Sequence, residues 1–227
     1  MKARDLFEWP ASLPFAEYFD LEAQPWEWLP MIQKALAEFD FDGQESKKEI
    51  PANVDISGAV YLHPSVEFIG HCTIRGPVWI GPDVQIRPGA FVRGNVIVGK
   101  GSVLGNVSEY KNCLLMENVE TPHYNYVGDS ILGNKAHLGA GAICANLRLN
   151  QDEVVIRIEK ERYRTGLRKV GAILGDGAEA GCNSVLQPGT VHGKKAAVIS
   201  MPFSGYLPAG KMAIPESKCR VLKRPGF

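Results

Sequence analysis

The stretch VWIGPDVQIRPGAFVRGNVIVGKGSVLGN, residues 78–106, repeats a pattern of six residues. One position of each unit is aliphatic or aromatic, and the position two residues before it is small or β-branched. Counting in steps of six gives nine consecutive apolar positions: Ile56, Leu62, Phe68, Ile74, Ile80, Ile86, Val92, Val98 and Leu104. Their small or β-branched partners are Val54, Val60, Val66, Cys72, Val78, Val84, Ala90, Val96 and Ser102. A period of six fits neither a helix nor simple strand alternation, so this strict short repeat predicts a solenoid.

Each unit is expected to form a short strand with one inward side chain, and the small residue fits a tight corner. Three units close a triangular coil of eighteen residues, and successive coils stack about 4.8 Å apart. The pattern resumes at Leu132 and Leu138, and again between Leu174 and Leu186. We therefore predict an all-β solenoid over residues 51–203. Nine unbroken matches argue against a sandwich in which the period arises by chance.

One segment, TPHYNYVGDSILG at residues 121–133, interrupts the count. From Met116 the next position in register is Tyr126, ten residues further on instead of six. The four extra residues are predicted to bulge outward around His123. An imidazole accepts a proton near neutral pH, and we interpret this one as functional rather than structural.

Both ends of the chain depart from the repeat. The first 50 residues are predicted to form an arm, because Leu29, Ile32, Leu36 and Phe39 follow helical spacing and Gly43 is expected to end the helix. This arm would pack against the solenoid or a neighbouring subunit. Residues 204–227 are predicted to form a tail that caps the last coil.

A second interruption precedes Gly166. Val154, Ile156 and Ile158 alternate with other residues before a polar turn, which predicts a projecting hairpin at about 151–166. Its expected role is to clamp an adjacent subunit.

The composition excludes several classes of protein. Basic and acidic residues balance at 25 each, which gives no sign of a nucleic-acid or membrane partner. The first residues do not resemble a signal peptide and no long apolar run occurs, so we expect a cytoplasmic protein. The five cysteines show no C-x-x-C spacing, which argues against a disulfide framework and a structural zinc site.

Three cations share one face of the predicted solenoid. Arg75, Arg93 and Lys111 are eighteen residues apart and each follows an inward position, so they should stack. Like charges at this spacing repel by about 1 kcal/mol per pair in water. Either the side chains splay into solvent, or an anion such as phosphate sits beside them. His123 is predicted to lie one coil away from Lys111.

These residues carry a resemblance that covers roughly residues 55–200. The segments VRGNVIVGKGSVLGN (92–106), SEYKN (108–112), PHYNYVGDSILG (122–133), HLGAGAICANL (137–147) and GLRKVGAILGD (166–176) resemble the acetyltransferase domain of the bifunctional glucosamine-1-phosphate acetyltransferase/N-acetylglucosamine-1-phosphate uridyltransferase. They are closer still to sugar-1-phosphate nucleotidylyltransferase-acetyltransferases of archaea and bacteria. The resemblance implies a left-handed parallel β-helix, whereas the general rule for crossovers predicts a right hand.

The resemblance also implies a role for particular residues. His123 matches the general base, Asn146 a residue that holds the substrate and acetyl group, and the Ala140 N–H the oxyanion donor. The substrate-binding set consists of Arg93, Lys111 and Lys169 at the sugar phosphate, together with Tyr126, Glu109 and His137. Ala140 and Cys182 are expected to contact acetyl-CoA, and we interpret Cys182 as a small packing residue and not a nucleophile.

The implied activity is N-acetylation of an amino-sugar 1-phosphate by direct transfer from acetyl-CoA, as in biosynthesis of UDP-N-acetylglucosamine, without a metal. The family implies a homotrimer with acetyl-CoA in the groove between two prisms. Two departures from the family matter. His137 replaces an asparagine, which leaves glucosamine-1-phosphate and galactosamine-1-phosphate both open as substrates. The first fifty residues contain no G-x-G-T-R-like loop, so we do not expect uridyl transfer.

Other interpretations remain to be weighed. A γ-class carbonic anhydrase shares this fold but needs an H-x-x-x-x-H pair, which the five histidines do not provide. A non-catalytic β-helix that binds sugar phosphates or nucleotide sugars stays an alternative, because such a protein could keep the phosphate site. Acetylation of a nucleotide-linked amino sugar is a further possibility.

Overall fold

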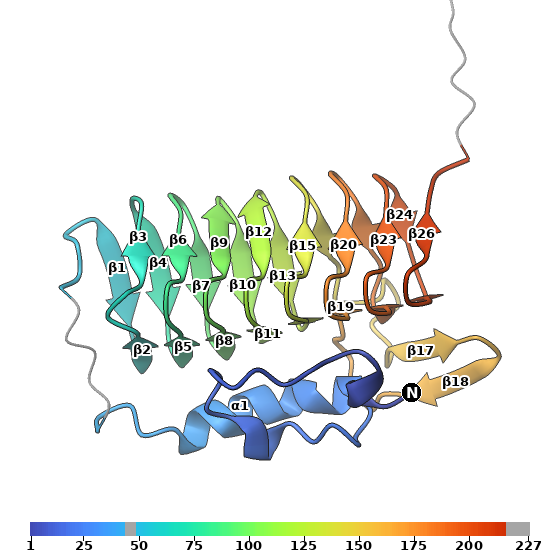
Figure 1. Cartoon of the computed structure of the whole chain (residues 1–227), viewed down its shortest axis with the longest axis horizontal. Coiled ribbons are helices and arrows are strands. Elements are labelled where there is room, and N and C mark those ends of the chain that lie inside the picture. The colour runs from blue at the N-terminus through green and yellow to red at the C-terminus, as the bar shows by residue number, and fades with distance from the viewer. Residues whose placement is uncertain (44–48, 217–227) are drawn as a thin grey trace, which may run out of the picture.

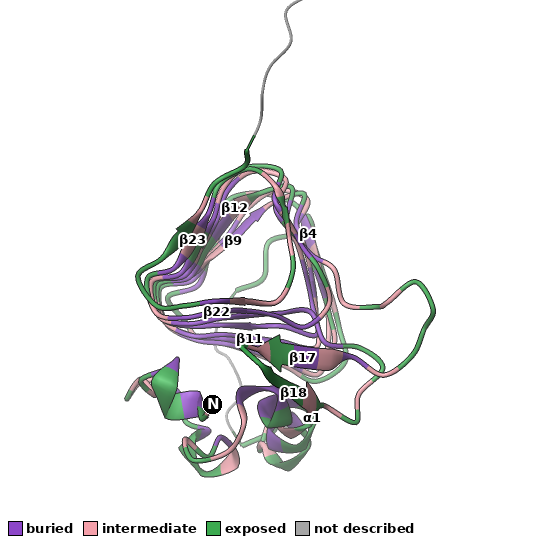
Figure 2. Cartoon of the chain, turned by 90° about the vertical axis from the view of Figure 1, so that its right-hand side faces the viewer, coloured by how far each residue is buried: buried purple, intermediate pink, exposed green. Residues whose placement is uncertain are grey.

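The computed structural model describes residues 1–43 and 49–216. Three parallel sheets of eight strands form the walls of a β-helix, and an N-terminal arm lies along one wall (Figure 1). Seen from the C-terminal end in Figure 2, the chain passes clockwise from the first sheet to the second and third while it advances toward the viewer. This sense of rotation makes the coil left-handed. The predicted fold is confirmed.

The strands of each sheet come from successive coils and pair in parallel. The first sheet contains β1 (Val54–Ser57), β4 (Cys72–Arg75), β7 (Phe91–Arg93), β10 (Glu109–Lys111), β13 (Tyr126–Gly128), β16 (Ile143–Cys144), β21 (Val185–Leu186) and β24 (Pro202–Phe203). The second contains β2 (Val60–Leu62), β5 (Val78–Ile80), β8 (Val96–Val98), β11 (Cys113–Leu115), β14 (Ile131–Leu132), β19 (Ala172–Leu174), β22 (Thr190–His192) and β25 (Tyr206–Leu207). The third contains β3 (Glu67–Phe68), β6 (Gln85–Ile86), β9 (Val103–Asn106), β12 (Glu120–His123), β15 (His137–Leu138), β20 (Glu179–Ala180), β23 (Ala197–Val198) and β26 (Met212–Ala213).

The inward side chains form one apolar core along the axis of the helix. The nine predicted inward residues from Ile56 to Leu104 lie in it, and those from Leu62 onward are buried except for Phe68. The register positions Met116 and Tyr126 were wrong, because Leu115 and Val127 point inward instead. One position on the second sheet differs, because the fully buried His192 stands between Leu174 and Leu207 of the neighbouring coils. Burial lowers the pKa of His192 to about 4. In the described chain neither of its ring nitrogens has a hydrogen-bond partner.

The predicted insertion of four residues is wrong. Phe91 pairs with Glu109, eighteen residues on, whereas Ile97 pairs with Leu114, seventeen residues on. The corner after β10 has therefore lost one residue. The coil then continues through Thr121, which pairs with Leu104 and points into the helix.

Thr121 was missed because it is polar at an inward position and because Met116, which packs outside the β-helix, was counted as inward in place of Leu115. Its hydroxyl is satisfied inside the helix, where it donates to the Val103 carbonyl at 2.9 Å and lies 2.6 Å from the Tyr110 hydroxyl. These contacts make up for the desolvation of both hydroxyls. From Leu115 the inward positions follow at Thr121, Val127 and Leu132, in steps of six, six and five residues, so this segment contains no bulge.

The arm packs on the outer face of the second sheet, below the triangle in Figure 2. It consists of three short 3-10 helices, η1 (Ala3–Asp5), η2 (Ala16–Tyr18) and η3 (Pro25–Glu27), followed by α1 (Trp28–Glu38). Its aromatic side chains meet the sheet directly, as in the edge contact between Phe15 and Trp79. The predicted helix is present and packs against the solenoid, but it ends at Glu38 and not at Gly43.

The predicted hairpin is also present, as β17 (Val155–Ile158) paired antiparallel with β18 (Glu161–Arg164). One of its faces packs against the arm of the same chain, where Tyr163 contacts Trp26 and Ile156 is buried. The β-helix continues past the predicted boundary at residue 203, because β25 and β26 add further strands up to Ala213. Residues 217–227 of the predicted capping tail lie outside the described residues. No helix of the described chain combines the length and apolar character needed to cross a membrane.

Candidate functional site

The first sheet ends at a corner where polar side chains converge on one carboxylate. Asp129 follows β13 and is only 4% exposed. Asn112 Nδ2 donates to its Oδ1 at 2.8 Å, and Asn146 Nδ2 donates to its Oδ2 at 2.5 Å. Lys111 Nζ lies 3.5 Å from Oδ2. Because hydrogen bonds to a carboxylate are strong, the carboxylate and the two amides of this group, here called the Asp129 cluster, are held in one arrangement.

Tyr126 joins the Asp129 cluster through Asn146, whose Nδ2 donates to the Tyr126 hydroxyl at 3.1 Å. The ring can lie across the strand because residue 128 is glycine. A Cβ at Gly128 would stand 2.5 Å from the Tyr126 hydroxyl and 2.8 Å from Asn146 Nδ2. Partial burial, and to a smaller extent the negative charge of Asp129, raises the pKa of Tyr126. The phenol is therefore neutral at physiological pH.

Asp129 was not among the predicted site residues. The miscounted register hid it, because Asp129 occupies the corner beside Lys111 only when Thr121 is taken as inward. Its left-handed backbone, with φ of 48°, is one that aspartate tolerates better than most residues. A coil of seventeen residues pairs Lys111 with Gly128, which places the Asp129 carboxylate next to Lys111.

The stacked cations predicted on this face do not share an anion. Each one has its own carboxylate: Arg75 lies 2.5 Å from Asp55, Arg93 lies 2.5 Å from Glu109, and Lys111 pairs with Asp129. The Arg75 guanidinium also lowers the pKa of Asp55. The like-charge repulsion is thus compensated within the chain, and the column by itself does not require a phosphate.

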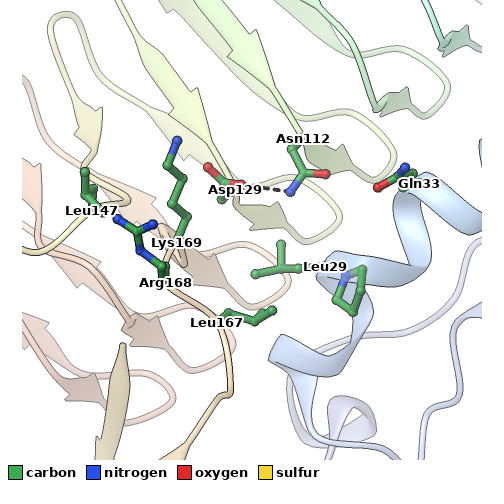
Figure 3. A pocket seen from close by; sticks show the side chains of 9 residues that line it. Leu29, Gln33, Asn112, Asp129, Leu147, Leu167, Arg168 and Lys169 are labelled. Atoms are coloured by element: carbon green, nitrogen blue, oxygen red, sulfur yellow. Dashed lines mark hydrogen bonds between the residues drawn. The ribbon is translucent and has the colours of Figure 1, made fainter. Parts of the chain in front are cut away.

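Lys169 reaches the same corner from a later part of the chain. Its neighbour Val170 donates from its N–H to the Asn146 carbonyl at 3.0 Å, and Lys169 forms an antiparallel bridge with Leu147. The Lys169 side chain runs beside Asp129 along a pocket of about 480 Å³ (Figure 3). Leu29 and Gln33 of α1 form the opposite wall, which the sequence did not predict.

His123 lies at the other end of the first sheet, at the corner where the third sheet passes into the first. Its carbonyl accepts the Gly141 N–H at 3.0 Å, and the Ala140 carbonyl accepts the Asn183 N–H at 2.8 Å. His123, Ala140 and Cys182 therefore occupy the same corner in successive coils, and we call this row the His123 edge. The imidazole and the Cys182 side chain are exposed, so Cys182 is not the packing residue that was predicted.

The His123 corner has the same geometry as its neighbours. His123 pairs with Asn106, and the next residue is left-handed in four coils: Val107, Tyr124, Gly141 and Asn183 have φ between 48° and 73°. No extra residues lift the imidazole outward, so its exposure comes from its corner position. Lys111 pairs with Gly128 at the far end of β13. The imidazole thus lies on the order of 10 Å from the Lys111 backbone along the strand direction, and not directly beside the column.

His137 joins neither group. It lies on the outer face of the third sheet, where its Nδ1 is 3.1 Å from Glu120 Oε2 and its strand neighbour is Glu179. Of the predicted site residues, the structure brings together Lys111, Tyr126, Asn146 and Lys169. It aligns His123, Ala140 and Cys182 along a separate corner. Arg93 and Glu109 form an ion pair between these two groups. Within the described residues no group of three or more His, Cys, Asp or Glu side chains could hold a metal ion.

The model of the GMPPB C-terminal domain family matches residues 74–201, which is more than half of the chain. The matched residues contain both the His123 edge and the Asp129 cluster.

Three curated relatives are similar over most of the chain. The bifunctional protein GlmU of Methanococcus aeolicus is 34% identical over 179 residues, which cover 79% of this chain and 43% of that protein. The bifunctional sugar-1-phosphate nucleotidylyltransferase/acetyltransferase of Sulfurisphaera tokodaii is 32% identical, with 77% and 43% covered. The uncharacterized acetyltransferase YaiX of Escherichia coli O6:K15:H31 is 31% identical, with 73% and 76% covered. The chain thus spans less than half the length of the two bifunctional relatives.

Proposed function

The chain belongs to the GMPPB C-terminal domain family, and on this premise we propose that it is an acetyl-CoA-dependent N-acetyltransferase of an amino-sugar 1-phosphate. The names of its relatives support the acetyl transfer and the sugar-1-phosphate class. The observation that carries the proposal is the His123 edge. Along this corner the His123 imidazole can accept a proton from the amine, the Ala140 N–H can stabilise the oxyanion, and the small Cys182 side chain leaves room for the pantetheine arm.

His123 acts as the general base. An ammonium group has no free electron pair, so the sugar amine must lose a proton before it attacks the thioester. An ammonium releases that first proton to solvent, and the exposed imidazole accepts the second proton, which the nitrogen loses as the C–N bond forms. Such a base contributes typically 10²–10⁴-fold to the rate.

The Ala140 N–H donates to the oxyanion of the tetrahedral intermediate. Among the described hydrogen bonds, the neighbouring N–H groups of Gly139 and Gly141 are used within the helix, to the Ala180 and His123 carbonyls, whereas none uses the Ala140 N–H. A donor of this kind is worth about 3–4 kcal/mol in other acyl transfers. When the intermediate collapses, the C–S bond breaks and the coenzyme A thiolate takes up the proton that the imidazole holds.

The substrate phosphate is held by Arg93 and Lys111, with Lys169 as a third cation. In these substrates the amine and the phosphate are on neighbouring carbons, so the cations must turn from their carboxylates toward His123 when substrate binds. Exposed ion pairs such as Arg93–Glu109 are weak, typically 0–1 kcal/mol, and permit this movement. Tyr126 and Asn146 position the sugar from the Asp129 cluster.

Acetyl-CoA lies along the His123 edge in this proposal, with its pantetheine arm past Ala140 and Cys182. We further propose a homotrimer, in which the groove is completed by a second subunit, and a cytoplasmic location. His137 could contact substrate only from the third sheet, and so from a different face of the molecule.

The test is release of coenzyme A from acetyl-CoA in the presence of glucosamine-1-phosphate or galactosamine-1-phosphate. Wild type is compared with His123→Ala and with His71→Ala, which removes an exposed histidine from the same row of corners several coils away. We expect His123→Ala to lose 10²–10⁴-fold in kcat and His71→Ala to keep the wild-type rate. Binding of a sugar phosphate without turnover by the wild type would instead favour a binding-only β-helix.

A further inference from the structure

A second pocket lies between the hairpin and the last coils, away from the Asp129 cluster. Its volume is about 380 Å³, and three of its lining side chains are arginines, Arg148, Arg157 and Arg162. No acidic residue lines it. We call it the hairpin pocket.

The three arginines have no carboxylate of their own. Arg157 and Arg162 stand directly opposite each other across the hairpin, an arrangement of like charges that destabilises a strand pair. In the described chain no salt bridge joins any of the three to an acid. Arg148 is held by a different contact, since its Nη1 donates to the Glu153 carbonyl at 2.8 Å.

Two acidic residues of the hairpin segment, Glu153 and Glu161, are engaged elsewhere. Glu153 pairs with Arg164 at 2.6 Å and also accepts the Gly166 N–H at 2.7 Å. Glu161 bonds to the Tyr163 hydroxyl, on the face of the hairpin that packs toward the arm. The hairpin pocket therefore keeps its positive charge, in contrast to the column of Arg75, Arg93 and Lys111.

The coil side of the hairpin pocket leaves room for a ligand. Gly205 has a positive φ of 89° and a Cβ there would meet nothing within 4 Å, whereas Gly189 is packed closely against Val154 and Ile156. The exposed Ser204 adds a hydroxyl donor. Planar guanidinium groups beside a hydroxyl and bare backbone suit the oxygens of a phosphate group.

We propose that the hairpin pocket binds a phosphate or diphosphate group. The bound anion would relieve the repulsion between Arg157 and Arg162 and tie the hairpin to the last coils. This site is separate from the residues assigned to the sugar phosphate and goes beyond the proposed function. The group could belong to coenzyme A or to another phosphorylated molecule.

The experiment is isothermal titration of the whole chain with inorganic pyrophosphate. The double variant Arg157→Gln/Arg162→Gln should bind at least about 10-fold more weakly than wild type. Arg164→Gln is the matched control, because Arg164 is on the same strand but already paired, and it should bind as wild type does. Equal affinity of wild type and the double variant, or no binding by wild type, would overturn the proposal.

A second readout covers the case in which the double variant is altered in fold. Pyrophosphate should raise the Tm of wild type and of Arg164→Gln but not that of the double variant, whose Tm without pyrophosphate should be no lower than that of wild type. Competition then identifies the source of the group. Displacement of pyrophosphate by coenzyme A but not by dephospho-coenzyme A assigns the site to the 3′-phosphate, and displacement by neither assigns it to another phosphorylated ligand. None of these outcomes depends on acetyl transfer.

Discussion

The two ends of the first sheet are built in opposite ways. At the Asp129 cluster a nearly buried carboxylate accepts bonds from two amides, so these side chains are fixed before any ligand arrives, and Lys111 lies beside them at 3.5 Å. At the His123 edge the backbone is bonded to the next coil, but the imidazole and the Cys182 side chain face solvent. Under the proposed function, this difference means that one end positions the substrate and the other reacts, with a bound substrate or a second subunit completing the reacting end.

The largest expected effect is a loss of stability when the Asp129 carboxylate is removed. Asp129→Ala would leave the amides of Asn112 and Asn146 and the Lys111 ammonium without their acceptor. We expect a loss of roughly 3–5 kcal/mol in unfolding free energy, measured by urea denaturation. Asp83→Ala is the control, since Asp83 also has positive φ but is exposed. Equal stability of the two variants would mean that the Asp129 cluster is not preorganised.

The conservative variant separates structure from function at the same residue. Asp129→Asn keeps the shape but removes the charge that holds Lys111. If the Asp129 cluster only supports the fold, kcat/KM should follow stability. If it positions Asn146 and Tyr126, kcat/KM should fall while the protein stays folded.

The next largest effect concerns how the free energy of unfolding depends on pH. Burial lowers the pKa of His192 to about 4 from an ordinary value of 6.5. The unfolded chain therefore takes up a proton first, and stability present above pH 6.5 is lost as pH falls toward 4. The loss amounts to about 3 kcal/mol.

His192→Leu should abolish this part of the acid sensitivity, because leucine occupies the same position in the coils on either side. Thermal unfolding of wild type and variant between pH 7 and pH 4 measures it. An unchanged difference in Tm across this range would show that His192 does not titrate on unfolding.

The smallest effect is expected between the two ends, at Arg93. Glu109→Gln removes the carboxylate that competes with substrate for the guanidinium, so KM should fall by about two- to threefold, in line with the small energy of exposed ion pairs. Asp55→Asn makes the same change beside Arg75, one coil away from Arg93, and should leave KM unaltered. A rise in KM for Glu109→Gln would instead mean that Glu109 itself binds the sugar.

The sequence predicted the coil because aliphatic side chains mark its inward positions. It failed where polar residues take those positions. Thr121 is satisfied by hydrogen bonds inside the helix, and reading it as outward produced both the imagined bulge and the missed Asp129. The contact between α1 and the Lys169 pocket joins residues far apart in the chain, and no repeat encodes it. His123 is exposed as predicted, but its exposure comes from its position at a corner and not from a bulge of extra residues.

The most direct test of the central claim is chemical rescue at the reacting end. Acetyl transfer to an amino-sugar 1-phosphate is measured for His123→Ala with and without free imidazole, beside Lys111→Ala. The account predicts that imidazole restores part of the rate of His123→Ala, because it replaces the missing base, and does nothing for Lys111→Ala. A His123→Ala variant that transfers acetyl groups at the wild-type rate without imidazole would contradict it.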